Sequence, residues 1–120
     1  MKIEKIRGVT AYKKNVILGV TKLVCSEYSI KYEDIFTKSR AYIYSVPRMV
    51  AVGLLRNVFH INDRTLSDYF GFVSHSSIYH ASKSLDERVK TDPEIAVVVA
   101  SVLKQFKTLI PNPVETAHEN

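Results

Sequence analysis

Apolar residues recur at helical spacing along most of the chain, and turn residues divide this pattern into about six segments. A first helix is predicted from about Asn15, as its N-cap, to Tyr28. Ile17, Val20, Val24 and Tyr28 recur there at helical spacing. The pattern predicts an all-α protein of about six helices.

Two further helical segments follow, separated by a basic stretch. A short turn of helix is predicted at Tyr32–Phe36, before the polar segment 37–44. The next helix is predicted to begin near Pro47, a residue suited to the first helical position, and to end near Phe59. Because this segment is apolar on most of its circumference, we expect it to be a central, buried helix.

The middle of the chain predicts a helix pair. After a turn at residues 62–64, Thr65 and Asp68 have the spacing of a capping box, and Gly71 is a C-terminal stop. Ser74 is expected to cap a longer helix that ends near Val89. A short helix, a glycine-bearing turn and a longer helix outline a helix-turn-helix between Thr65 and Val89, although many helical hairpins share this outline.

A last helix begins at residues 91–94, which supply a cap, a first-turn proline and an acidic residue. Its predicted apolar stripe is Ile95, Val98, Val99, Val102, Leu103 and Phe106. We expect an N-terminal extension at residues 1–13, a helix-turn-helix domain at 14–110 and a frayed tail at 111–120.

The longer helix of the pair has two contrasting faces. The predicted core face is Ile78, Ala81, Leu85 and Val89, and the opposite face is Ser76, His80, Lys83 and Glu87, with Ser77 and Ser84 at the margin. The first two turns of the outer face lack acidic residues. Serine and histidine can reach base edges in a major groove, and lysine can reach phosphate, while the plain alternative is a solvated face.

Charge sharpens this picture. The 120 residues suit one domain, and a net charge of +5 is divided unevenly. Residues 1–60 carry eleven basic and four acidic side chains, against six and eight in residues 61–120. One part of the surface is therefore expected to face a polyanion, either nucleic acid or an anionic membrane.

The sequence gives little support to a disulfide-bonded, metal-binding, hydrolytic or membrane-spanning protein. Cys25 is the only cysteine and lies in an apolar run, so we expect a buried thiol and no disulfide. His75 and His80 are five positions apart, which does not suit zinc, and the serines beside His75 lack a nucleophile elbow. No apolar stretch is long enough to span a bilayer and no signal peptide is evident, so a cytoplasmic protein without metal or cofactor is expected.

Residues 70–85, FGFVSHSSIYHASKSL, resemble the signature of the C-terminal DNA-binding domain (domain IV) of the bacterial replication initiator DnaA. That signature reads roughly F-G-G-R-D-H-T-T-V-L-H-A, and the Phe-Gly pair, both histidines and the alanine match without a gap. Upstream, residues 37–40 resemble the family's basic loop and 46–48 its A-R-P-R helix start. The resemblance covers about residues 14–107 and implies a fold shared with the Trp repressor.

The resemblance implies DNA-contact roles at matching positions. It places Arg40 in the minor groove, Arg48 and Arg56 on phosphates, and the major-groove readers at His75, Ser76 and Ser77. We also expect Lys38 and Lys83 to contact phosphate, and Ser74 and His80 to belong to the same DNA-binding face. Val73 and Ser74 replace the family's Arg-Asp, and the basic loop holds fewer arginines, so recognition of the standard DnaA box is not expected to follow automatically.

The sequence therefore predicts a non-enzymatic reader of double-stranded DNA that regulates replication initiation or transcription. The chain has no GxxxxGK[ST] phosphate loop, so neither nucleotide binding nor the ATPase activity of full-length initiators is expected. The alternative is a protein-protein interaction module that kept the fold and lost DNA affinity. Phe72, Val73 and Tyr79 near the DNA face favour this alternative.

Overall fold

The computed structural model describes residues 9–37, 39, 41–71 and 74–109, and within these ranges every regular element is helical. The elements are α1 (Ala11–Glu27), the short 3-10 helix η2 (Tyr32–Phe36), α2 (Tyr42–Asn57), α3 (Asp63–Phe70), α4 (His75–Thr91) and α5 (Pro93–Leu109). The prediction of an all-α fold of about six helices, including the turn at Tyr32–Phe36, is confirmed.

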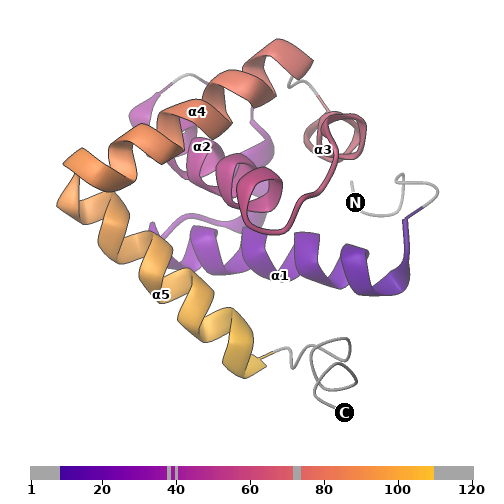
Figure 1. Cartoon of the computed structure of the whole chain (residues 1–120), viewed down its shortest axis with the longest axis horizontal. Helices are drawn as coiled ribbons and strands as arrows, with labels where there is room; N and C mark the ends of the chain where they lie inside the picture. The colour runs from indigo at the N-terminus through magenta and orange to yellow at the C-terminus, as the bar shows by residue number, and fades with distance from the viewer. Residues whose placement is uncertain (1–8, 38, 40, 72–73, 110–120) are drawn as a thin grey trace.

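Helix α2 lies at the centre of the fold, with α1 on one side and α4 on the other (Figure 1). Val50, Leu54 and Leu55 of α2 are at most 1% exposed, as its nearly continuous apolar surface predicts. Helix α5 packs against α1 and the end of α4. The core thus joins all four long helices, and α4 packs against the buried helix α2.

The short helix α3 is anchored by aromatic side chains. Tyr69 and Phe70 are fully buried and stack edge-on at a centroid distance of 4.9 Å. Phe36 of η2 packs on both rings, and the hydroxyl of Tyr32 lies 2.8 Å from that of Tyr69. These contacts fix α3, and therefore the turn that follows it, against the rest of the core.

Three predicted helix starts are wrong. Helix α1 begins at Ala11 rather than near Asn15, because Thr10 accepts the N–H of Lys13 and supplies the cap. Helix α2 begins at Tyr42 and contains Pro47, since the carbonyl of Ala41 already accepts the N–H groups of Tyr44 and Ser45.

Helix α3 begins at Asp63, earlier than predicted. Its N-cap is Asn62, whose side chain accepts the N–H of Thr65 at 2.8 Å. Thr65 is therefore the third residue of the helix and is buried, so the capping box predicted from Thr65 and Asp68 does not form. The residues read as a turn, 62–64, include the cap and the first helical residues.

The remaining boundaries agree with the sequence. Asp92 caps α5 by accepting the N–H groups of Glu94 and Ile95, and Pro93 is its first residue. The α5 stripe is confirmed: Ile95, Val102 and Phe106 are buried and the others pack against the core. The division into segments 1–13, 14–110 and 111–120 stays a prediction, and residues 1–8 and 110–120 lie outside the described ranges.

Candidate nucleic-acid interface

The turn between α3 and α4 is built by local chemistry. Gly71 adopts a left-handed conformation (φ 84°) and donates its N–H to the carbonyl of Ser67 at 2.8 Å, ending α3. Ser74 then caps α4, because its Oγ accepts the N–H of Ser77 at 3.0 Å. Both predicted signals, the glycine stop and the serine cap, are confirmed, and they determine where α4 begins.

The first turns of α4 are open to solvent. Ser74, His75, Ser76, Ser77, His80 and Lys83 are all exposed, and no acidic residue lies in the first turn. The positive end of the helix dipole lies at this same end, which favours a nearby anion. Ser74 and Ser77 also bond to each other through their hydroxyls at 3.0 Å, whereas His75 and Ser76 are exposed beside them.

The ring of Tyr79 lies near two residues that are predicted to contact phosphate, Lys83 and Arg56. Its ring is 48% exposed and has Lys83 Nζ on α4 and the guanidinium of Arg56 on α2 each 5.9 Å from its centroid. The ring of His80 lies edge-on to it at 5.7 Å. The aromatic ring gathers two cations on one surface, which suits contact with a polyanion. Phe72 and Val73, named with Tyr79 as an apolar patch, lie outside the described residues.

Arg56 is fixed by two neighbouring helices. Its Nε donates to Asp63 Oδ1 of α3 at 2.8 Å, and its Nη1 donates to Ser82 Oγ of α4 at 3.1 Å. Its side chain is still 32% exposed. Arg56 therefore connects α2, α3 and α4, and its predicted phosphate contact would be made from a position already held by the protein.

A polar cluster that the sequence analysis missed holds α4 on α2. Asn57 donates to the Ser82 carbonyl and to Asp86 Oδ1, each at 3.0 Å, and the Ser82 hydroxyl donates to the Asn57 side-chain carbonyl. Ser82 is 3% exposed, whereas Val89, predicted for the core face, is 37% exposed. Ser82 follows the buried Ile78 by four residues, and this spacing could have predicted from the sequence that Ser82 faces α2.

Arg48 organises the basic loop between η2 and α2. Its guanidinium donates to one carbonyl of η2, from Nε to Ile35 at 3.0 Å, and to two carbonyls of the loop, from Nη2 to Thr37 at 2.6 Å and to Ser39 at 3.3 Å. Burial lowers its pKa, but an arginine remains charged at neutral pH. Lys38 and Arg40, the other predicted contacts of this loop, lie outside the described residues.

The predicted site residues therefore fall into two groups. Among the described ones, Ser74 and five residues of α4 are exposed at the start of that helix, whereas Arg48 and Arg56 lie on α2, half-buried and bonded to neighbouring segments. Their individual roles on DNA stay predictions. Within the part of the chain that the structure describes, no three His, Cys, Asp or Glu side chains are placed to hold a metal ion. No helix there is long and apolar enough to cross a membrane.

A family model described as the bacterial DnaA protein helix-turn-helix matches residues 17–85. The chain belongs to this DnaA family. The matched segment runs from α1 into α4 and includes all ten predicted site residues. The chain is therefore a DNA-binding helix-turn-helix domain of the DnaA domain IV type, as its sequence signature predicts.

Individual relatives agree with this family. The chain is 33% identical over 97 residues to the chromosomal replication initiator protein DnaA of Nautilia profundicola, covering 79% of the chain and 22% of that protein. It is 29% identical over 87 residues to DnaA of Methylacidiphilum infernorum, covering 72% and 19%. The chain thus spans about a fifth of the length of these DnaA relatives.

Proposed function

We propose that this domain binds double-stranded DNA with sequence preference, placing the start of α4 in the major groove. The observation that carries the proposal is the exposed, acid-free first turn of α4, held in place by the Gly71 stop and the Ser74 cap. A helix start that is fixed by its flanking turn can present His75 and Ser76 to base edges without further ordering.

The supporting contacts surround this helix. Lys83 and Arg56 each lie 5.9 Å from the centroid of the Tyr79 ring, and from there they would bind backbone phosphates next to the groove. Arg48 would contact phosphate, as would Lys38, while Arg40 would enter the minor groove. Two of the three carbonyls that Arg48 bonds, those of Thr37 and Ser39, belong to the same loop as Lys38 and Arg40, so Arg48 would also set the path of that loop.

In the cell, this binding would regulate replication initiation or transcription in the cytoplasm, by occupation of a DNA site rather than by catalysis. The replacement of the family's Arg-Asp by Val73 and Ser74 indicates that the preferred site differs from the standard DnaA box. Loss of a base-reading carboxylate removes one source of discrimination between base pairs.

Selection of bound duplexes from a random pool tests the proposal. We expect enrichment of one short sequence, and we expect His75→Ala to weaken binding to that duplex by about 1–3 kcal/mol with little change on unrelated duplexes. Lys90→Ala, at the exposed far end of α4, is the matched control and should leave the preference unchanged. If selection enriches no sequence, or if His75→Ala weakens all duplexes equally, α4 does not read bases as proposed.

A further inference from the structure

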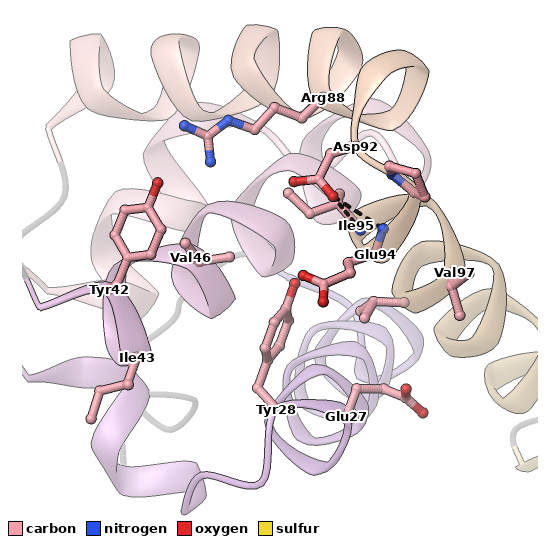
Figure 2. Close-up of a pocket in the computed structure, with 12 residues that line it drawn as sticks. Glu27, Tyr28, Tyr42, Ile43, Val46, Arg88, Asp92, Glu94, Ile95 and Val97 are labelled. Carbon is pink, nitrogen blue, oxygen red and sulfur yellow. Dashed lines mark hydrogen bonds between the residues drawn. The ribbon is translucent and has the colours of Figure 1, made fainter.

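A groove opens at the end of the domain where α4 passes into α5, and it encloses about 700 Å³ (Figure 2). Its walls come from the ends of α1, α2, α4 and α5. Val46, Ile95 and Val98 give it an apolar lining. Its size is that of sites that enclose a small ligand or a few side chains of a partner.

Several large apolar side chains around the groove are exposed to solvent, which is unfavourable for apolar surface. Tyr42 is 73% exposed, Ile43 61% and Val97 67%, and all three line it. They are the three most exposed large hydrophobic residues among the described parts of the chain. Isolated exposed apolar residues need no explanation, but three around one groove are typical of an interaction surface.

The rim of this groove is acidic, in contrast to the net charge of the chain. Glu27, Asp92 and Glu94 line it with one cation, Arg88. Figure 2 shows the Tyr28 side chain extending toward the Glu94 carboxylate. Burial first, and then the charges of Asp92, Glu94 and Glu27, raise the pKa of Tyr28. Glu27 Oε2 accepts hydrogen bonds from Ser101 and Gln105 and Asp92 Oδ1 caps α5, but both side chains still add negative charge to this end of the groove.

The groove is separate from the DNA-reading end of α4. Arg88 follows His75 by thirteen residues of continuous helix, which corresponds to about 20 Å along the axis. The carboxylates that line the groove would repel a phosphate placed in it, so the groove does not suit the polyanion proposed for the start of α4. A bound molecule here would leave the reading face open.

We propose that this groove binds a short segment of a partner protein in which a lysine or arginine lies between apolar side chains. The apolar lining would receive the flanking side chains, and the three carboxylates complement the central cation. The proposal goes beyond DNA recognition, because it makes the domain able to hold a protein while α4 occupies DNA.

Selection of random twelve-residue peptides on the immobilised full chain tests this inference. We expect the selected peptides to carry lysine or arginine flanked by apolar residues. Measured by fluorescence polarisation, their affinity should fall at least about tenfold in Val97→Asp, which places a charge in the apolar wall, and about threefold in Glu94→Gln. Val58→Asp and Glu33→Gln, exposed residues outside the groove, are matched controls and should bind as the unmodified chain does.

Four results would overturn the inference. They are failure of any basic-apolar peptide to be enriched, enrichment of acidic peptides, equal binding by Val97→Asp, and displacement of the peptides by duplex DNA. Sedimentation of the chain alone adds a further test, since dimerisation abolished by Val97→Asp would assign the groove to a second copy. Circular dichroism of each variant separates loss of the site from loss of the fold.

Discussion

The close approach of α2 and α4 at Gly53 predicts how α4, the helix proposed to read DNA, responds to one added methyl group. A Cβ at Gly53 would lie 2.5 Å from Leu85 Cδ2 and 2.8 Å from Leu85 Cβ. The Leu85 side chain can rotate its Cδ2 away, but its Cβ is fixed to the backbone of α4. Gly53→Ala therefore requires α4 to move relative to α2.

Two opposing effects set the magnitude. Alanine is favoured over glycine inside a helix by about 1 kcal/mol, whereas overpacking a dense core costs about 1–3 kcal/mol. We expect Gly53→Ala to lower the free energy of unfolding by about 1 kcal/mol. Gly53→Val adds two more methyl groups at the same contact, so it should cost more than Gly53→Ala.

Urea unfolding measures the stability change, and titration with the selected duplex measures its effect on binding. Because DNA reading needs α4 to be placed within about 0.5 Å, we expect Gly53→Ala to weaken binding even where the domain remains folded. If Gly53→Ala instead raises the free energy of unfolding by about 1 kcal/mol, the full gain in helix propensity, and leaves the DNA affinity unchanged, Gly53 does not determine the position of α4 on α2.

Three other perturbations test separate parts of the structure. Ser74→Ala removes the α4 cap and should lower the free energy of unfolding in urea by about 1 kcal/mol, whereas the control Ser84→Ala, inside α4, should not lower it. Burial raises the pKa of Cys25 to about 11 from its usual 9.0, so the unfolded chain loses this proton first and stability should fall between these pH values. Urea titrations across this range should show a steeper fall than in Cys25→Ala, and equal slopes would contradict the burial of the thiol. Arg48→Lys keeps the charge but loses the fork that bonds three carbonyls, so it should cost about 1–2 kcal/mol in urea unfolding, and an unchanged stability would exclude the anchoring role.

Sequence periodicity predicts the fold because the apolar faces agree with helical spacing almost everywhere, with Val89 of α4 as an exception. The α5 stripe, the buried α2 and the Gly71–Ser74 turn all depend on neighbours within a few residues. The first residue of each helix was harder to predict, since several residue types can cap a helix N-terminus. Thr10 and Asn62 cap α1 and α3, although Asn15 and Thr65 carry side chains of the same kind.

The sequence predicts the part of the candidate site that depends only on which side chains are exposed. The outer face of α4 follows from the helical wheel, and His75, Ser76 and Lys83 are exposed as expected. The contacts of Arg48 with the loop and of Arg56 with Asp63 and Ser82 depend on tertiary packing, which periodicity does not contain. The family signature assigns both arginines to phosphate, whereas the geometry also gives them partners within the protein.

A salt titration of duplex binding tests the central claim most directly. For DNA binding through this face, log affinity should fall linearly with log salt, with a slope of roughly −0.9 for each phosphate neutralised, and Arg40→Ala should reduce that slope by about one unit. Lys90→Ala is the matched loss of charge at the far end of α4 and should leave the slope unchanged. If no duplex binds at low salt, including duplexes recovered from random pools, the domain is a protein-interaction module and the proposed DNA-reading function is wrong.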